Sequence, residues 1–109
     1  MTKPVVGIIG NSYMIDKRFR AQAVGERGLR AVAEVTGALP LMFASLPGVT
    51  DLDALLDVVD GVLLTGARAN VHPARFHVAP DPRHEPYDPD RDDIALTLID
   101  LCVQRGVPL

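Results

Sequence analysis

Tryptophan is absent from this sequence of 109 residues, aromatic residues make up only 5% of it, and cysteine occurs once. The single cysteine, Cys102, excludes an internal disulfide and any metal site that needs several thiolates. No apolar run approaches the roughly 18 residues that a membrane-spanning helix needs. The N-terminus also lacks the apolar segment and the cleavage site of a secretory signal. We therefore expect a cytoplasmic protein that does not act at a membrane.

Positive charge is not clustered anywhere in the chain. The sequence has 11 Lys and Arg residues against 14 Asp and Glu residues, which gives a net charge of −3. Nucleic-acid binding usually requires a basic patch, so we expect no nucleic-acid partner. The three histidines, His72, His77 and His84, share one proline-rich segment, but their spacings fit no helical zinc pattern. We expect no metal ion.

An alternation of apolar patterns runs through the whole chain, whose hydrophobic fraction of 48% suits a globular core. The patterns predict strands over residues 5–10, 39–44 and 61–65, helices over 19–36, 51–59 and 90–104, and a further strand that starts at 107–109. Residues 11–18 should form a polar loop, and residues 71–87 an ordered loop without regular structure. This order predicts an α/β domain with a parallel sheet. We expect the sheet to be truncated after about four strands, so that residues 1–109 form the N-terminal part of a single domain.

Particular residues mark the ends of the predicted helices. Gly37 should cap the C-terminus of the first helix, and Thr50 or Asp51 the N-terminus of the second. Asp90 should cap the third helix, which Gly106 ends. The first helix is expected to turn one face to the core, formed by Leu29, Val32, Ala33 and Thr36.

Four aspartates gather where the third helix is predicted to start: Asp88, Asp90, Asp92 and Asp93. They could form a cation site, but acids in a first helical turn interact favourably with the helix dipole, which explains them more simply. We expect Arg91 to pair with these acids or to reach back to the preceding loop.

The loops after the first and third predicted strands are the expected walls of a site. Parallel sheets bind ligands at the carboxyl ends of their strands, and these loops follow Gly10 and Thr65. Gly66 follows the third strand directly, where glycine permits a positive φ and a close approach of substrate to the backbone. The alternative is an ordinary turn glycine. The sequence has no GxGxxG and no Walker motif, so we expect no phosphate-binding loop.

Cys102 has to be considered as a nucleophile because it is the chain's only thiol. It falls on the same face of the last predicted helix as Ile94, Leu98 and Ile99, a face that should pack on the sheet. The C-terminus of a helix raises the pKa of a thiol rather than lowering it. We therefore expect Cys102 to be a core residue and not the nucleophile.

Four segments together resemble the class I glutamine amidotransferase-like hydrolases, and among them the γ-glutamyl-γ-aminobutyrate hydrolases of the peptidase C26 group. They are KPVVGIIGN, AEVTGALPLMF, DGVLLTGARANVHPARF and DPDRDDIALTLIDLCVQRGVPL. The most specific features are a loop motif (Gly66, Asn70, Val71 and Pro73) and a helix-start motif (Asp88, Pro89, Arg91 and Asp92). The fold that this resemblance implies is flavodoxin-like, a parallel sheet with helices on both faces.

The resemblance implies a Cys-His-Glu triad whose cysteine follows the fourth strand in a Cys-Arg-Gly context. That nucleophile is expected beyond Leu109, and no catalytic residue of the triad is present in this chain. By position, Gly66 or Ala67 would supply an oxyanion-hole amide, although Ala67 stands where many relatives have a second glycine. The substrate loop would include Arg68 and Asn70. None of the three histidines occupies the triad position, which lies far downstream in the family.

The function that the resemblance implies is cleavage of γ-glutamyl amides, such as γ-glutamyl-γ-aminobutyrate, to glutamate and an amine, without any cofactor. The expected partners are a small γ-glutamyl substrate, the C-terminal half of the same enzyme and, in a homodimer, a second copy. One alternative is a glutaminase subunit that passes ammonia to a synthase. Another is a small α/β binding domain that is complete and not catalytic.

Overall fold

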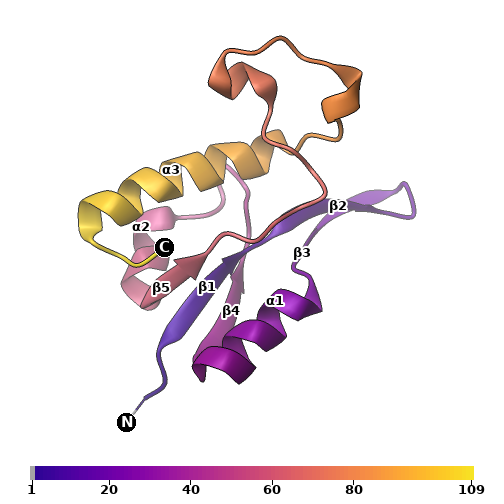
Figure 1. Ribbon diagram of the computed structural model, residues 1–109. Coiled ribbons are helices and arrows are strands. Elements are labelled where there is room, and N and C mark those ends of the chain that lie inside the picture. Colours follow the sequence, from indigo (N-terminus) through magenta and orange to yellow (C-terminus); the bar gives the residue numbers. More distant parts are fainter. Residues whose placement is uncertain (1) are drawn as a thin grey trace.

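Three parallel strands form the centre of the protein in a computed structural model that describes residues 2–109 (Figure 1). The strands β1 (Val5–Ile9), β4 (Leu39–Phe43) and β5 (Gly61–Leu63) are ordered β4-β1-β5. β1 is therefore the central strand, and its register aligns Ile9 with Phe43 of β4 and Ile8 with Leu63 of β5. The expected parallel sheet is confirmed. Its middle strand is β-branched and apolar, as a strand covered on both faces should be.

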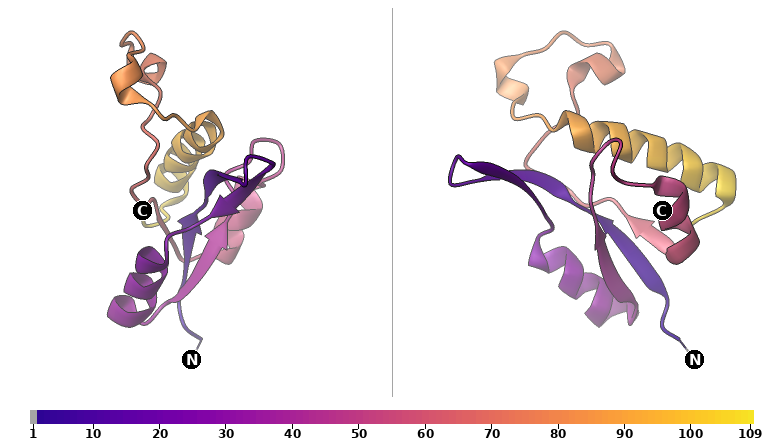
Figure 2. Two further views of the ribbon diagram at one scale, coloured as in Figure 1. Left: turned by 90° about the vertical axis from the view of Figure 1, so that its right-hand side faces the viewer. Right: turned by 180° about the vertical axis from the view of Figure 1, so that it is seen from behind.

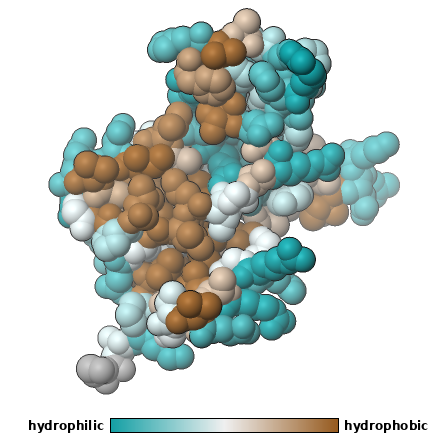
Figure 3. Space-filling view, in the orientation of Figure 1, coloured by the Kyte–Doolittle hydropathy of each residue, from teal (hydrophilic) through white to brown (hydrophobic). Residues whose placement is uncertain are grey.

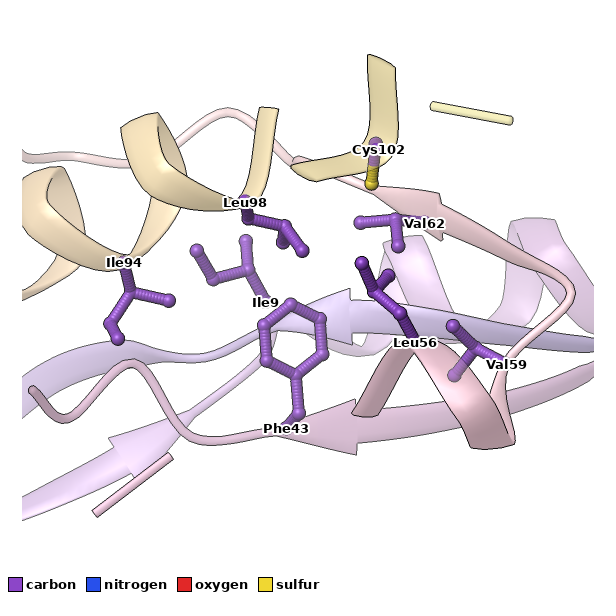
Figure 4. Packing of buried hydrophobic residues seen from close by; sticks show 8 residues of the cluster. All are labelled: Ile9, Phe43, Leu56, Val59, Val62, Ile94, Leu98 and Cys102. Carbon is purple, nitrogen blue, oxygen red and sulfur yellow. The ribbon is translucent and has the colours of Figure 1, made fainter. Parts of the chain in front are cut away.

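Helices cover both faces of this sheet (Figure 2). The helices α2 (Leu52–Val58) and α3 (Pro89–Arg105) lie on one face, where Ile9 and Phe43 pack with residues of both helices (Figure 4). The other face carries α1 (Glu26–Ala31) and the π-helical turn η1 (Val32–Thr36), with Ile8 and Val32 buried between them and the sheet. Neighbouring residues of β1 thus supply two separate apolar cores.

Most of the predicted helix ends are confirmed. Asp51 caps α2, accepting a hydrogen bond from Ala54 N–H, and Gly37 and Gly106 end their helices with φ values of 72° and 68°. The N-terminal cap of α3 is Asp88 and not Asp90, because Pro89 occupies the first helical position, where proline is favoured. In the first helix, Ala33 and Thr36 are exposed, contrary to the predicted core face.

The largest error in the predicted elements concerns residues 11–23. They form an antiparallel hairpin of β2 (Asn11–Ile15) and β3 (Phe19–Ala23), where a polar loop and the first turn of a helix were expected. The turn between the strands places Asp16 and Lys17 at φ values of 51° and 54°, and Arg18 N–H donates to Ile15 C=O (2.9 Å). The hairpin leaves the sheet at the carboxyl end of β1 (Figure 1).

A long segment connects β5 with α3. It contains the short 3₁₀ turns η2 (Pro73–Phe76) and η3 (Pro82–His84), so the expectation of no regular structure was correct except for these turns. At the other end of α3, residues 107–109 run beside β5 and make one backbone hydrogen bond to it, from Val62 N–H to Pro108 C=O (2.9 Å). They do not form the regular strand that the sequence predicts. Apolar side chains gather over the side of the molecule where α3, β5 and the C-terminus lie in this view (Figure 3).

None of the helices in residues 2–109 combines the length and the apolar character needed to cross a membrane.

Candidate functional site

A cleft of about 710 Å³ opens at the carboxyl end of the parallel sheet. Three segments form its walls: the hairpin that follows β1, the loop that follows β5, and the residues leading into α3. The lining residues are Asn11, Ser12, Tyr13, Met14, Arg20, Ala67, Arg68, Ala69, Glu85, Pro86, Tyr87, Asp88 and Pro89. The loops after the first and third predicted strands therefore meet at one cleft, as expected for a parallel sheet.

The backbone at Gly66 and Ala67 is exposed where β5 ends. Neither N–H group donates a hydrogen bond to any atom of residues 2–109. A Cβ atom built on Gly66 would meet nothing within 4 Å. Gly66 does not use the positive φ that glycine permits, since only Gly37, Gly48 and Gly106 have one among the described glycines. The feature that distinguishes Gly66 is therefore open space beside two backbone donors, not an unusual backbone conformation.

Asp88 ties the start of α3 to the hairpin. Its Oδ1 accepts a hydrogen bond from Arg91 N–H (3.2 Å) as the helix cap, and its Oδ2 accepts one from Ser12 N–H of β2 (3.0 Å). The residue is only 6% exposed. One carboxylate thus fixes two walls of the cleft against each other.

Arg91 and Asp92 tie the same helical turn to the segment that leaves β5. The Arg91 guanidinium donates a hydrogen bond to Thr65 C=O, and Asp92 Oδ2 accepts one from His72 N–H (2.9 Å). Burial lowers the pKa of Arg91, and the nearby charges of Asp88 and Asp92 oppose this. The expectation that Arg91 reaches back to the loop is confirmed. The helix-start motif therefore connects α3 with the hairpin and, at two points, with the segment that leaves β5.

The two residues predicted for the substrate loop lie in different surroundings. Arg68 lines the cleft, its residue surface is exposed, and it forms no ion pair within residues 2–109. Asn70 instead supports the loop itself, because its Nδ2 donates to His84 C=O (2.7 Å) and its backbone N–H donates to Pro86 C=O (2.9 Å). A contact of Asn70 with substrate remains a prediction.

Of the three histidines, His72 stabilises the loop that contains them all. His72 Nδ1 accepts a hydrogen bond from Ala74 N–H (3.1 Å) as the cap of η2, and its ring lies 4.7 Å from that of Tyr87. Within residues 2–109, no group of three His, Cys, Asp or Glu side chains is arranged to hold a metal ion.

The hairpin supplies polar residues to the cleft that sequence reasoning did not single out. Arg20 donates to Ser12 Oγ (3.0 Å) and pairs with Asp90 at the start of α3 (3.1 Å). Gln22 also donates to Ser12 Oγ (3.1 Å), while its Oε1 accepts from Ser45 after β4. The alternation of residues in 19–23 was the available signal, but it was interpreted as the start of a helix.

Cys102 lies in the core, about 20 Å along α3 from its N-terminal cap at a rise of about 1.5 Å per residue. It is 1% exposed and packs with Leu98 and Val62 (Figure 4). Burial raises the pKa of the Cys102 thiol, and the positive charge of Arg105 opposes this. The thiol is therefore neither accessible nor activated, which confirms that it is a core residue.

The raised pKa of Cys102 predicts a loss of stability at alkaline pH. The unfolded chain loses the thiol proton first, near pH 8.5, so the stabilisation is complete below that pH and is lost as pH rises through the pKa of the folded state. We expect the free energy of unfolding, measured in urea, to fall more steeply above about pH 8.5 in the wild type than in Cys102→Ala. Cys102 is the only titratable group that differs between the two proteins, so equal slopes would contradict this prediction.

Comparison with known proteins agrees with this arrangement. The family model described as Peptidase C26 matches residues 4–109, whereas a search of curated protein sequences found no match. The matched range includes the whole sheet, the hairpin and every residue that lines the cleft. The chain therefore belongs to the peptidase C26 family, a class I glutamine amidotransferase-like group, and the function that this membership implies is of the hydrolase or amidotransferase type.

Proposed function

We propose that this chain forms the oxyanion-hole side of a cysteine-dependent hydrolase that cleaves γ-glutamyl amides. The observation that carries the proposal concerns the backbone N–H groups of Gly66 and Ala67, which follow β5 next to the cleft. Neither group donates a hydrogen bond within residues 2–109. Such donors serve a reaction that develops negative charge on a carbonyl oxygen. Cys102 is buried in the core and is not the nucleophile of this proposal; the proposal assigns the nucleophilic cysteine to a part of the enzyme outside residues 1–109.

The proposed reaction proceeds through a thioester. The cysteine thiolate attacks the γ-carbonyl carbon, and the electron pair of the C=O bond moves to the oxygen, which accepts hydrogen bonds from Gly66 or Ala67 N–H. Collapse of this intermediate breaks the C–N bond, and the amine leaves with the proton that the cysteine thiol gave up when it became the thiolate. Water then cleaves the thioester to give glutamate and restore the thiol. One such donor typically lowers the barrier by about 3 kcal/mol.

The charges around the cleft suit a γ-glutamyl group, which carries one α-carboxylate and one α-ammonium. Arg68 offers a guanidinium that no carboxylate within residues 2–109 neutralises, and the carboxylate of Glu85 lies on the same cleft. Both residues are exposed. A substrate with both charges could contact them without displacing an existing ion pair.

The test compares the 109-residue chain with the same chain extended by the residues that its gene encodes after Leu109. We expect the extended protein to release the amine from γ-glutamyl-γ-aminobutyrate and the chain alone to release none, with or without Cys102→Ser. Release of ammonia from glutamine, but not of γ-aminobutyrate, would favour a glutaminase subunit instead. Thioester formation at Cys102 in the 109-residue chain would contradict the proposal.

Gly66→Ala sharpens this test within the extended protein. A Cβ atom at Gly66 meets no protein atom within 4 Å and no positive φ opposes it, so the free energy of unfolding should stay within about 0.5 kcal/mol of the wild type. The methyl group would instead occupy space that the substrate oxygen needs. We expect hydrolysis to fall by about tenfold or more, as for a disturbed oxyanion hole. Unchanged hydrolysis would argue against Gly66 as part of the site.

A further inference from the structure

The guanidinium of Arg91 makes a single hydrogen bond within residues 2–109, and its acceptor is the carbonyl of Thr65, the residue before Gly66. Arg91 stands in the first turn of α3, and Thr65 lies where the chain leaves β5. Arg91 Nε is buried and has no hydrogen-bond partner among the described residues. A guanidinium with five donors is therefore held by one carbonyl oxygen.

The flanking carboxylates do not bind this guanidinium, although they are near enough in sequence to do so. Asp88 accepts hydrogen bonds from the backbone of Arg91 and of Ser12, and Asp92 accepts one from the backbone of His72. No ion pair involves Arg91 within residues 2–109. The side chain is thus directed to Thr65 by its place on the helix, and neither neighbouring acid diverts it.

The carbonyl of Thr65 and the N–H of Gly66 belong to one peptide unit. That unit is planar and trans, so its C=O and its N–H point in opposite directions. A donor that holds the Thr65 oxygen consequently fixes the direction in which Gly66 N–H points. Because the donor is charged, the hydrogen bond is stronger than a neutral one, and it polarises the peptide so that the N–H becomes a better donor.

We propose that Arg91 is a positioning residue for the oxyanion hole: its contact with Thr65 orients and polarises the Gly66 N–H. This inference rests on the proposed function for its catalytic meaning, because Arg91 itself touches no reacting atom. The partial burial of the side chain supports it, because the guanidinium is partly desolvated where it meets this carbonyl, and this desolvation lowers the pKa of Arg91. Lysine carries the charge but lacks the planar fork, so it should restore only part of the effect.

The first experiment measures the peptide directly, in the ¹⁵N-labelled 109-residue chain. Arg91→Met removes the donor and keeps an unbranched stem. We expect the ¹⁵N signal of Gly66 to move upfield, and its amide hydrogen to exchange more slowly because the less polarised N–H is a weaker acid, while circular dichroism stays unchanged. Arg75→Met is the matched control. Arg75 forms an ion pair with Asp93, which lies near Arg91 on α3, but Arg75 does not contact Thr65. The Gly66 signal should not move in that control.

Arg91→Lys keeps the test decisive if Arg91→Met does not fold. In Arg91→Lys the Gly66 signal should lie between those of the wild type and a peptide fragment covering residues 61–70. A Gly66 signal that stays at its wild-type position in a folded Arg91 variant would overturn the inference.

The second experiment uses the extended enzyme and separates this inference from the proposed function. Arg91→Met should lower kcat for the γ-glutamyl amide about tenfold to a hundredfold with KM nearly unchanged, the pattern of an interaction made only in the transition state. A wild type that hydrolyses the amide and a variant with equal kcat would refute the positioning role alone. A wild type without γ-glutamyl hydrolysis would refute the proposed function, whatever the Gly66 signal shows.

Discussion

Replacement of Asp88 with alanine is expected to lower the free energy of unfolding by about 2 to 4 kcal/mol. Two losses combine in this value. Removal of a helix cap typically costs about 1 kcal/mol, and Asp88 caps the longest helix of the protein. The same change leaves Ser12 N–H without its partner in a partly buried position, and a buried donor without an acceptor costs about 1 to 3 kcal/mol.

Asp51→Ala is the matched control for Asp88→Ala. Asp51 also caps a helix, but its side chain accepts one hydrogen bond only, from Ala54 N–H, and the residue is exposed. We expect Asp51→Ala to cost about 1 kcal/mol. The loss of unfolding free energy for Asp88→Asn should lie between those for Asp88→Ala and Asp51→Ala. The single side-chain oxygen of asparagine can still cap α3, but its amide nitrogen cannot accept a hydrogen bond from Ser12 N–H. Urea denaturation measures all three, and equal losses at the two aspartates would show that the contact with the hairpin contributes nothing.

The position of this cap also shows why the sequence analysis predicted the wrong aspartate. Aspartate patterns alone favoured Asp90, which has two acids close behind it. Proline at the first helical position moves the cap to the preceding residue, and Pro89 therefore selects Asp88. Asp90 and Asp92 nevertheless lie in the first turn of α3, where the helix dipole favours acids, as expected. The remaining helix boundaries follow from residues with strong local preferences, such as Asp51 and Gly37.

The hairpin could not be predicted in the same way, because its turn lacks a strong local signal. Asp16 and Lys17 both adopt a positive φ, a conformation that is most often signalled by Asn-Gly or Asp-Gly. Lysine gives no such indication. The hairpin is also held by contacts that are distant in sequence: Gln22 Oε1 accepts hydrogen bonds from Ser45 N–H and Oγ (both 3.0 Å). Tertiary contacts of this kind override a weak helical periodicity.

The candidate site was predictable at the level of loops but not of side-chain partners. A parallel sheet brings the loops after Gly10 and Thr65 to one edge, and the structure places a cleft there. Gly10 has a further role that its spacing does not reveal, because a Cβ atom would lie 2.7 Å from Gln22 Oε1 and 2.9 Å from Phe43 O. Likewise, no periodicity indicates that Arg91 reaches Thr65. Only the packing of α3 on the sheet brings the two together.

That packing leads to the second large effect, which is expected for Leu98→Ala. Leu98 is fully buried and belongs to the cluster that joins α3 to β1, β4, β5 and α2 (Figure 4). Truncation of such a leucine removes apolar contacts and leaves a cavity, which together cost about 2 to 5 kcal/mol. In a domain of this size, each kcal/mol lowers the melting temperature by about 4 to 8 °C. Thermal and urea unfolding should therefore both show a large loss.

Leu96→Ala makes the same chemical change on the same helix and serves as the control. Leu96 is 37% exposed, and alanine has the higher helix propensity, so its replacement should cost less than about 1 kcal/mol. If Leu98→Ala costs no more than Leu96→Ala, then α3 does not rest on the sheet through this cluster. The polar contacts at the N-terminus of α3, together with those from Arg105 to α2, would then have to hold the helix. A large difference between the two leucines would instead mean that core packing sets the position of α3, and that the hydrogen bonds at its N-terminus aim its residues at the cleft.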